Sequence, residues 1–491
     1  MLTLKFEIMN TDIRNLEPKR VWNNFADLNA IPRASKKEER VIAFIVDFGK
    51  KLGLKTIIDP VQNVIIKKPA TKGMENRKAI VMQSHLDMVH QKNNDTIFDF
   101  DTEGIKMYVD GDWVRADGTT LGADNGLGVA SIMSILESTD IPHPAIEALF
   151  TIDEETGMTG AMGLEGGYLE GEILLNLDTE DDDEIGVGCA GGVDVTAKKT
   201  YILESVSANS IAYKITVKGL QGGHSGMDII KGFGNANKLM NRVLYATIEN
   251  SLIANIDGGS LRNAIPRESN ATIVTENDNA FINEFEKIKS EIINEFNTIE
   301  SDLEISITKT DSPQGTLSKK EQKLLINATY SAYNGVFRMS PDIENLVETS
   351  NNIARVIVKD GAIKIGCLTR SSVESGKWDL AYTLKSSFEL ANFNVEFGGS
   401  YPGWKPNPDS AILKVMKKVY QDMFNEKANI LACHAGLECG LLGTHYPEMD
   451  MISFGPTIKG AHSPDERASI SSTQKYWSYL LKTLENIPEK I

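Results

Sequence analysis

The chain has 491 residues, more than one compact hydrophobic core supports, and the length indicates roughly two to four domains. Hydrophobic residues make up 41% and charged residues 24%, an ordinary balance for a globular protein. The net charge of -17 argues against a nucleic-acid partner, because such partners require a basic surface. No apolar run is long enough for a transmembrane helix, so we expect no membrane partner.

Cysteine usage and the N-terminal segment indicate the compartment. No two cysteines form a Cys-x-x-Cys pair, which disfavours a disulfide framework and fits a reducing environment. The N-terminus has no basic segment followed by an apolar stretch, so we expect no signal peptide. These observations predict a cytoplasmic protein. The four cysteines are Cys189, Cys367, Cys433 and Cys439.

The first expected elements are two helices within residues 18–56, followed by short strands. Pro18 suits the first turn of the first helix. The second helix has apolar residues at helical spacing up to Leu52, and Ser35 with Glu38 matches a capping box. Buried strands are then expected at 64–66, 79–82, 148–152 and 173–177, with an apolar helix at 126–136.

Histidine and carboxylate side chains stand directly after three of these strands. His85 and Asp87 follow the second strand, Glu154 and Glu155 follow the third, and Asp178 follows the fourth. Strands separated by helices indicate an α/β domain. In such domains ligand sites lie outside the carboxyl ends of the strands, so these five side chains mark a candidate site.

The pattern of the chain changes after about residue 195. Residues 205–398 have the alternation of an α+β insertion, and the breaker-rich segment 401–406 is a natural boundary after it. Further strands are expected at 211–217, 271–274, 303–307 and 451–454, and further helices at 234–248, 279–296 and 409–424.

A C-terminal histidine, His462, follows the last expected strand. If it joins the earlier side chains in one site, the first domain must be discontinuous. We therefore predict an α/β domain from residues 1–204 and 399–491, with residues 205–398 as a second domain inserted into it.

His85 and Asp87 are the first pair of candidate site residues. Residues two apart on an extended segment point to the same side, so both can face one site. In that case His85 binds a metal ion and Asp87 orients its ring through a hydrogen bond. The alternative is that His85 and Asp87 form a polar pair at a strand end, with no metal ion, in which each satisfies the hydrogen-bonding groups of the other.

Asp124 lies in the segment Gly122-Ala123-Asp124-Asn125-Gly126. The Asp-Asn-Gly order by itself favours a turn. Together with the other candidate ligands, it favours a carboxylate that bridges two metal ions, which in catalytic pairs lie about 3.5–4 Å apart.

The adjacent carboxylates Glu154 and Glu155 suggest two different chemical roles. Glu155 would bind a cation, and Glu154 would accept a proton from a metal-activated water and pass it to the leaving amine. Asp178 ends an apolar strand, where burying a carboxylate costs free energy unless a partner such as a metal ion satisfies it. The alternative interpretation of Asp178 is a helix N-cap. His462 supplies a second nitrogen ligand. Two histidines with three carboxylates suit two divalent ions, zinc, cobalt or manganese.

The order of these motifs resembles a known family. His-x-Asp, Gly-x-Asp-x-Gly, Asp-Glu-Glu-x-Gly, an Asp and a C-terminal His together resemble the M20 family of dizinc metallopeptidases. The segments 189–192, 434–440 and 455–458 are similar to its aminoacyl-histidine dipeptidase branch, also called Xaa-His dipeptidase or peptidase D. The resemblance extends over essentially the whole chain.

The resemblance implies a role for each candidate residue. Asp124 would bridge two ions, and a cis peptide is expected between it and Asn125. It also implies a zinc-peptidase-like catalytic domain, a mixed sheet flanked by helices, with an inserted lid domain. The remaining implied roles are His85 and Asp178 on one zinc ion, Glu155 and His462 on the other, Asp87 orienting His85, and Glu154 as general base.

Three residues of the expected lid also match family positions. His224 resembles the histidine that stabilises the tetrahedral oxyanion. Asn263 and Arg370 resemble substrate-binding residues, and Arg370 would suit a C-terminal carboxylate through two hydrogen bonds. The simpler interpretations are a turn histidine, a loop amide and a surface arginine.

The resemblance implies metal-dependent hydrolysis of dipeptides with a free C-terminal carboxylate, Xaa-His and more broadly Xaa-Yaa. The partner would be a small peptide. Alternatives are tripeptide aminopeptidase or N-acyl amino acid deacylase activity, a catalytically silent peptide-binding module, and a structural scaffold. The insertion is long enough for a doubled lid that supplies His224 within one chain; a homodimer is the other route.

Overall fold

The computed structural model describes residues 10–490. The chain divides into two compact units. Among the described helices, none combines the length and the apolar character that crossing a membrane requires. Unit 1 comprises Met1–Gly188, Pro406–Ala432 and Glu438–Ile491, and unit 2 comprises Cys189–Lys405 and Cys433–Leu437.

Unit 1 is built on an eight-stranded mixed sheet in the order β1-β2-β6-β3-β7-β19-β8-β18. The four central strands β6, β3, β7 and β19 are parallel, and antiparallel neighbours extend the sheet on both sides. The strands are β1 (Lys55–Ile58), β2 (Val64–Lys68), β3 (Ile80–His85), β6 (Ile146–Thr151), β7 (Ile173–Asn176), β8 (Glu184–Cys189), β18 (Asn429–Cys433) and β19 (Asp450–Ser453).

Helices flank this sheet, so the predicted mixed α/β fold class is confirmed. Every residue of β3 and β6 is buried, as expected for parallel strands that are covered on both faces. The helices of unit 1 are η1 (Ile13–Asn15), α2 (Lys19–Asn29), α3 (Glu39–Lys51), α4 (Ala123–Glu137), α5 (Thr159–Gly163), α10 (Ala411–Phe424), α11 (Glu438–His445) and α12 (Ile470–Glu485).

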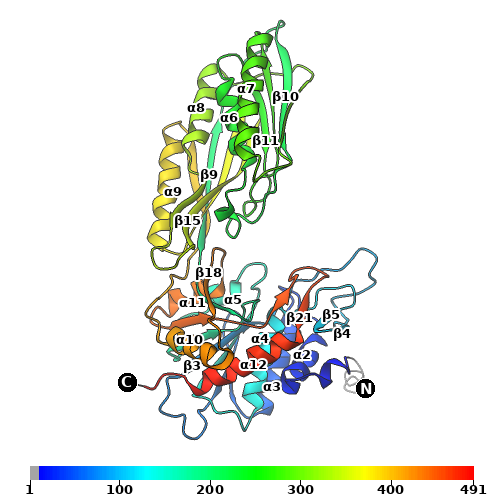
Figure 1. The fold of residues 1–491 in the computed structure, drawn as a ribbon, viewed down its shortest axis with the longest axis vertical. Helices are drawn as coiled ribbons and strands as arrows, with labels where there is room; N and C mark the ends of the chain where they lie inside the picture. The colour runs from blue at the N-terminus through cyan, green and yellow to red at the C-terminus, as the bar shows by residue number, and fades with distance from the viewer. Residues whose placement is uncertain (1–9, 491) are drawn as a thin grey trace. The chain divides into compact units, whose positions relative to one another are not determined.

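A small four-stranded sheet joins the C-terminal part of the chain to the N-terminal part. Its order is β20-β21-β5-β4, and β21 pairs antiparallel with β5. Figure 1 accordingly shows the red C-terminal elements in the same unit as the blue and cyan ones. The strands are β4 (Met107–Asp110), β5 (Trp113–Ala116), β20 (Ile458–Lys459) and β21 (Arg467–Ser469).

Unit 2 contains a nine-stranded sheet with the path β13-β10-β12-β11-β15-β16-β9-β17, and β14 pairs with β15. The strands are β9 (Gly191–Thr200), β10 (Ile211–Lys218), β11 (Leu252–Gly258), β12 (Ser269–Thr275), β13 (Glu304–Lys309), β14 (Gly335–Met339), β15 (Val347–Lys359), β16 (Ala362–Ser371) and β17 (Asn394–Tyr401). The helices are η2 (Ile229–Lys231), α6 (Ala236–Ala246), α7 (Asp278–Phe296), α8 (Lys319–Ser331) and α9 (Glu374–Glu389).

The sheet of unit 2 consists of two copies of one motif. The first copy runs β10-α6-β11-β12-α7-β13, and the second runs β9-α8-β15-β16-α9-β17 with the first copy inserted after β9. In each copy the fourth strand lies beside the first, then the third, then the second. This is the order of a ferredoxin-like βαββαβ unit. The second strands of the two copies, β11 and β15, pair antiparallel and join the halves into one sheet.

The start of unit 2 follows from strand pairing. The predicted boundary lay after residue 204, but β9 pairs with β16 and with β17 along most of its length. This strand is therefore part of the second sheet, and the unit begins at Cys189. A strand's sheet cannot be read from its own sequence, because its partners lie more than a hundred residues away.

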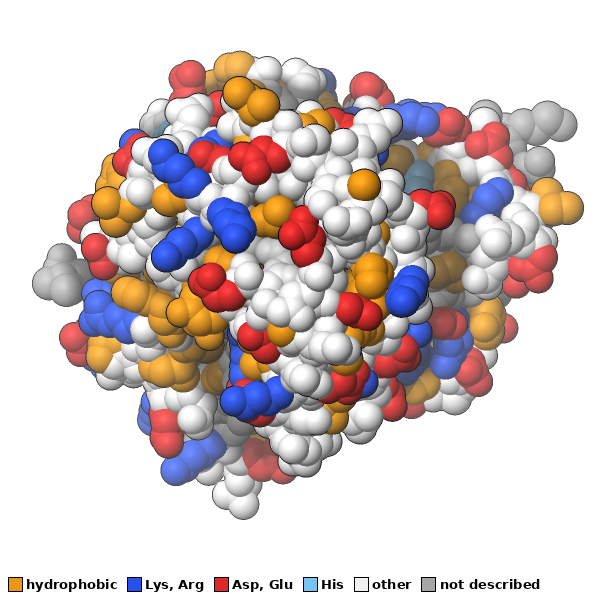
Figure 2. All heavy atoms as spheres, turned by 90° about the horizontal axis from the view of Figure 1, so that it is seen from above, with side chains coloured by type: hydrophobic (Ala, Val, Ile, Leu, Met, Phe, Trp, Pro, Cys, Tyr) orange, Lys and Arg blue, Asp and Glu red, His pale blue; other side chains and the backbone are white. Residues whose placement is uncertain are grey.

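The surface carries charges of both signs. On the face drawn in Figure 2, lysine and arginine side chains lie among aspartate and glutamate side chains. Short ion pairs of this kind join Arg242 to Glu295 and Lys289 to Glu286 in unit 2. Exposed pairs of this type contribute little to stability, so the buried core of each unit holds the fold together.

Candidate metal centre

The candidate site of unit 1 lies at the carboxyl ends of three parallel strands. His85 is the last residue of β3, Asp178 follows β7 by two residues, and Glu154 and Glu155 follow β6. Register places His85 beside Thr151, the last residue of β6. Because parallel strands end at the same edge of the sheet, these side chains converge, as the sequence predicts.

Asp124 lies between two histidines. His85 Nε2 is 3.2 Å from Asp124 Oδ1 and 3.5 Å from Asp178 Oδ1. His462 Nε2 is 3.2 Å from Asp124 Oδ2 and 2.9 Å from Glu155 Oε2. The two oxygens of one carboxylate thus face different histidines, and each histidine has a further carboxylate beside it.

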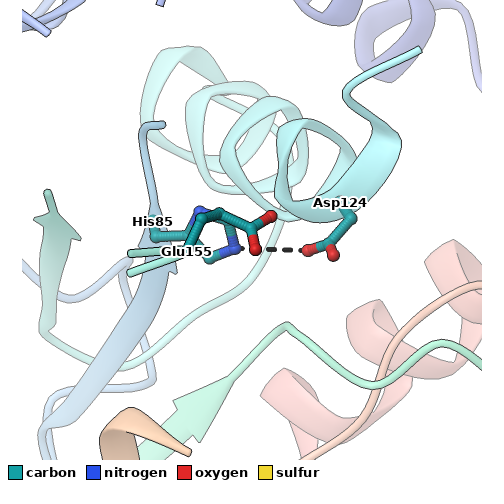
Figure 3. A group of neighbouring side chains, drawn as sticks. All are labelled: His85, Asp124 and Glu155. Atoms are coloured by element: carbon teal, nitrogen blue, oxygen red, sulfur yellow. Dashed lines mark hydrogen bonds and ion pairs between the residues drawn. The ribbon is translucent and has the colours of Figure 1, made fainter. Parts of the chain in front are cut away.

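Three of these side chains form a compact candidate metal-binding group. His85, Asp124 and Glu155 each offer a ligand atom, and these atoms all lie within 4.8 Å of one another. Figure 3 shows the three side chains directed toward a common space, with Asp124 at the start of helix α4. A nitrogen and two carboxylates in this arrangement can hold a divalent ion.

The backbone before α4 presents Asp124 to the site. Gly122 adopts φ 71°, and Asp124 itself has non-helical angles. The Asp124–Asn125 peptide is cis, as the family resemblance implies. Helix α4 also approaches β3 closely, because a Cβ on Gly128 would lie 2.4 Å from Ser84 Oγ. The segment therefore bends at Asp124 and Asn125 at the start of α4, and such a bend is compatible with a ligand role for Asp124.

The charge balance of the cluster favours a cation. Hydrogen bonds that His462 donates to the carboxylates of Asp124 and Glu155 raise the pKa of His462 to about 11. Burial would lower the pKa of His85, but the carboxylates of Asp178 and Asp124 raise it well above its usual value. Protons on the histidines thus stabilise a surplus of buried negative charge, which metal ions would neutralise instead.

Unsatisfied carboxylate oxygens point to the same conclusion. Glu155 Oε1 is buried and has no hydrogen-bond partner among residues 10–490, and buried Asp178 Oδ1 has only the 3.5 Å contact with His85 Nε2. Leaving such an oxygen without a partner costs free energy. Imidazole nitrogen and carboxylate oxygen are also the donors that zinc accepts. The residues therefore fit a divalent metal ion.

Asp87 organises the site more broadly than its predicted role. His85 Nδ1 lies 3.1 Å from the main-chain oxygen of Asp87 and 3.4 Å from its Oδ1. The carboxylate also accepts the main-chain N–H groups of Glu154 and Glu155, at 3.1 and 3.2 Å. Burial opposes ionisation, yet hydrogen bonds from His85 and Ser35 lower the pKa of Asp87 to about 2.

The predicted capping box at the start of α3 is wrong. Ser35 Oγ donates to Asp87 Oδ2 at 2.8 Å. Glu38 Oε1 accepts the main-chain N–H groups of Lys36 and Asp153, at 2.9 and 3.1 Å. Ser35 thus supports the segment that follows β3, and Glu38 supports the segment that follows β6. Their own sequence neighbourhood does not reveal this, because Asp87 and Asp153 lie far away in sequence.

Glu154 lies beside the cluster, and no hydrogen bond or ion pair joins its side chain to His85 or His462 within residues 10–490. Burial, together with the charges of Asp178, Glu438 and Glu155, raises the pKa of Glu154 well above its usual value. A carboxylate with a raised pKa is suited to accepting and returning a proton near neutral pH.

Glu438 is a buried carboxylate of the segment 434–440, one of the segments similar to the aminoacyl-histidine dipeptidase branch, which places it as a candidate for the lining of the cleft. Its Oε2 accepts hydrogen bonds from Gln83 Nε2 at 2.6 Å and Thr151 Oγ1 at 2.8 Å. Burial raises the pKa of Glu438 to about 8. Its partners lie on β3 and β6, the strands that lead into the candidate ligands.

Unit 2 brings together the predicted lid residues His224 and Arg370. His224 Nδ1 accepts the main-chain N–H groups of Gly226 and Met227, at 3.2 and 3.1 Å, so a neutral ring carries its proton on Nε2. That Nε2 lies 3.5 Å from Arg370 Nη2, a contact that is not a hydrogen bond when Nε2 carries the proton, because a guanidinium only donates. Burial and the charge of Arg370 lower the pKa of His224, which keeps the ring neutral.

Arg370 and Asn263 lie in different surroundings. Arg370 is buried on β16 and donates to Tyr401 Oη at 2.8 Å. Asn263 is exposed in the loop between β11 and β12, where its main-chain oxygen accepts the N–H of Ser225 at 2.8 Å. Asn263 is thus held next to His224. The surface-arginine interpretation of Arg370 is wrong, because its guanidinium is buried.

His434 is a second buried histidine of unit 2. Its Nε2 lies 2.8 Å from Ser350 Oγ. Its main chain passes so close to Gly226 that a Cβ there would lie 1.9 Å from the His434 oxygen, which explains the glycine. Burial, with the positive charge of Arg370 nearby, lowers the pKa of His434 to about 3.

Comparisons with known proteins agree on one group. The model of the Peptidase family M20/M25/M40 matches residues 81–486. The "Cytosol non-specific dipeptidase" of Escherichia coli (strain K12) is 44% identical over 487 residues, covering 98% of this chain and 100% of the relative.

Solved structures give the same result. The aminoacylhistidine dipeptidase of Vibrio alginolyticus matches with a TM-score of 0.93 at 44% identity, covering 98% of this chain and 99% of that one. The aminopeptidase PepT of Bacillus cereus matches with a TM-score of 0.57 at 16% identity, a likeness of fold.

Buried His434 makes the stability of the protein depend on pH. The unfolded chain protonates this ring near the ordinary histidine pKa of 6.5, whereas the folded chain does so only near about 3, so acidification favours unfolding. Changing the pH from 7 to 5 should therefore cost wild type roughly 1–2 kcal/mol more than His434→Gln. Urea unfolding at both pH values measures this difference. Ser350→Ala, which keeps the imidazole, should retain the wild-type dependence. Equal pH dependence in wild type and His434→Gln would contradict the assignment.

Proposed function

Because the chain belongs to the Peptidase family M20/M25/M40, we propose that it is a metal-dependent dipeptidase of the aminoacyl-histidine dipeptidase type. Membership of a peptidase family confirms the predicted class of enzyme, a hydrolase that acts on peptide bonds. Its substrate is accordingly a peptide. Two relatives that align over nearly the full chain are named as dipeptidases, which supports dipeptides as the substrate.

The observation that carries the proposal is the shared carboxylate of Asp124. Its two oxygens each lie 3.2 Å from a different histidine, so two divalent ions could share it. We assign His85 and Asp178 to one ion, and Glu155 and His462 to the other. When bound, the ions polarise the scissile carbonyl and lower the pKa of a water molecule. The donor set suits zinc, with cobalt or manganese as alternatives.

Glu154 would move the proton. Its pKa is raised by burial and by neighbouring carboxylates, so it can take a proton from the attacking water and deliver it to the leaving amine. The main-chain N–H of Glu154 donates to the Asp87 carboxylate, and this hydrogen bond fixes the backbone position from which the Glu154 side chain extends. Asp87 acts in the same way on Glu155 and also orients His85, so it positions both the base and two ligands.

We propose that unit 2 is the lid and binds the peptide. Neutral His224 presents an Nε2–H that could donate to the developing oxyanion. Arg370 would bind the C-terminal carboxylate, since its buried Nε has no partner among the described residues. Asn263, exposed beside His224, would bind the peptide main chain. The substrate would then be a peptide with a free C-terminus, Xaa-His or more broadly Xaa-Yaa.

Compartment and assembly complete the proposal. The name of the Escherichia coli relative places that protein in the cytosol, which supports a cytoplasmic location here. The doubled motif of unit 2 brings His224 of one copy to Arg370 of the other within one chain. A lid completed within one chain would make a homodimer unnecessary for catalysis, and sedimentation of the purified protein distinguishes monomer from dimer.

Substrate length and terminal groups test the proposal directly. We expect cleavage of Xaa-His, Xaa-Gly and Xaa-Leu dipeptides by zinc-loaded enzyme, followed by release of free amino acids. The N-acetylated form of the same dipeptide tests deacylase activity, and a tripeptide tests aminopeptidase activity. Faster turnover of either one than of every dipeptide would contradict a dipeptidase.

Glu154→Ala should bind metal normally but lose activity. Removing a general base lowers turnover by about 10²–10⁴-fold, while the proposed ligand set stays complete. Dipeptide turnover and metal content, measured on the same sample, separate the two effects. Glu165→Ala removes an exposed carboxylate of unit 1 and should match wild type. Wild-type turnover in Glu154→Ala would rule out the base role.

His85→Ala should lose metal. This substitution removes the only imidazole assigned to one of the two ions, so we expect the metal content per chain to fall below that of wild type. Elemental analysis after dialysis against zinc measures it. His445→Ala removes a histidine of unit 1 that is assigned to neither ion and serves as the control. Unchanged zinc content in His85→Ala would exclude this residue as a ligand.

A further inference from the structure

Glu466 is a buried carboxylate whose oxygens both bind the backbone that carries Asp124. Oε2 accepts the N–H groups of Leu121 and Gly122 at 2.7 and 2.9 Å. Oε1 accepts those of Ala123 and Asp124 at 2.8 and 3.2 Å. The residue is 2% exposed, so these four hydrogen bonds are shielded from water.

The four N–H groups belong to the segment that leads into helix α4: Leu121 and Gly122 precede the helix, and Asp124 has non-helical angles. Buried main-chain N–H groups need hydrogen-bond partners, and the N-terminus of the adjacent helix carries a partial positive charge. A carboxylate at this point satisfies the donors and interacts favourably with the local field. Glu466 therefore fixes the backbone angle at which α4 begins, and with it the direction of the Asp124 side chain.

Arg33 holds the same turn from the opposite side. It is fully buried, and its Nη2 donates to the main-chain oxygen of Gly122 at 2.5 Å. Its Nη1 donates to the main-chain oxygens of Leu86 and Asp87 at 3.0 and 3.1 Å. The turn before α4 is thus tied to the end of β3, where His85 lies.

Glu466 also belongs to the loop that carries His462. This loop connects β20 to β21, and hydrogen bonds between Ser463 and Gly460 and between Glu466 and Ser463 fold it tightly. One short loop therefore supplies a histidine on one side of Asp124 and the carboxylate that holds Asp124 in place. The distance between His462 and Asp124 depends on both.

We propose that Glu466 is a positioning residue for the shared carboxylate, and that it couples the two metal-binding halves of the site. The inference rests on the metal centre proposed above and deepens it. Glu466 does not contact the metal; it acts through the backbone of Asp124. Loss of the Glu466 charge should weaken the binding of both ions together, because both depend on the direction of the Asp124 side chain.

Glu466→Gln is the informative substitution. The glutamine oxygen can accept two of the four N–H groups, but its NH₂ group would face the other two and repel them. Residues that support metal ligands from outside typically change metal affinity by about 10–100-fold when mutated. We therefore expect zinc affinity of the full-length apoprotein to fall by that factor, measured by competition with a chelator.

Asp112 provides a matched control within unit 1. Its carboxylate accepts the main-chain N–H of Ser471 at 3.0 Å and the hydroxyl groups of Ser469 and Ser471 at 2.8 and 2.6 Å. It therefore anchors the start of α12 much as Glu466 anchors the start of α4, away from the ligands. Asp112→Asn should lower the unfolding temperature of the apoprotein but leave zinc affinity unchanged.

A second readout separates positioning from stability. The absorption spectrum of the cobalt-loaded protein reports ligand geometry, and it should change in Glu466→Gln but not in Asp112→Asn. Glu466→Asp keeps the charge on a shorter side chain and should regain part of the zinc affinity. It also serves as the test variant if Glu466→Gln does not fold, and it should then bind zinc more weakly than wild type.

Two results would overturn the inference. One is a folded Glu466 variant that unfolds at a lower temperature but keeps the wild-type zinc affinity and cobalt spectrum. In that case Glu466 would stabilise the fold without positioning Asp124. The other is weaker binding of one ion with the second unaffected. A wild-type protein that binds no zinc would instead refute the metal centre itself, so the two failures are distinguishable.

Discussion

The structure of unit 1 depends on how it accommodates buried negative charge. The largely buried carboxylates of Asp124, Asp178 and Glu155 converge with buried His85 and with His462, which is exposed. Carboxylates in such a place repel one another and lose hydration, so they require positive charge. The neighbouring carboxylates raise the pKa of both histidines, so protons would supply this charge when nothing else does. Bound cations would supply it instead, and metal binding would then contribute to the stability of the fold.

Much of the chain around the cluster serves to hold these side chains in place. Asp87 binds the backbone of Glu154 and Glu155, while Glu466 and Arg33 bind the turn before α4 from two sides. These groups use main-chain contacts, which do not depend on flexible rotamers. A metal pair needs its ligands fixed to within a fraction of an ångström, and this backbone network provides that rigidity.

More of the candidate site than of the groups that support it could be predicted from the sequence. The strand-end rule brings His85, Glu155 and Asp178 to one sheet edge. Asp124 and His462 do not follow from that rule, and they were predicted from their residue types and from the family resemblance. The supporting groups gave no such signal. Glu466 lies more than three hundred residues from the turn it binds, and Ser35 seemed to cap a helix but instead donates to Asp87. Local patterns describe neighbours in the chain, whereas these contacts form only after the sheet has assembled. Likewise β9 could not be assigned to its sheet before its partners were known.

The loop between β20 and β21 has a consequence for how the protein is made. His462 and Glu466 leave the ribosome after every other residue assigned to the centre. Until then the candidate centre lacks its second imidazole, and the turn before α4 lacks its carboxylate anchor. Because domains fold as units once their parts are present, unit 1 would complete the centre only after this loop has been made. Hydrolytic competence would be acquired in a single late step, when the final hairpin pairs with β5.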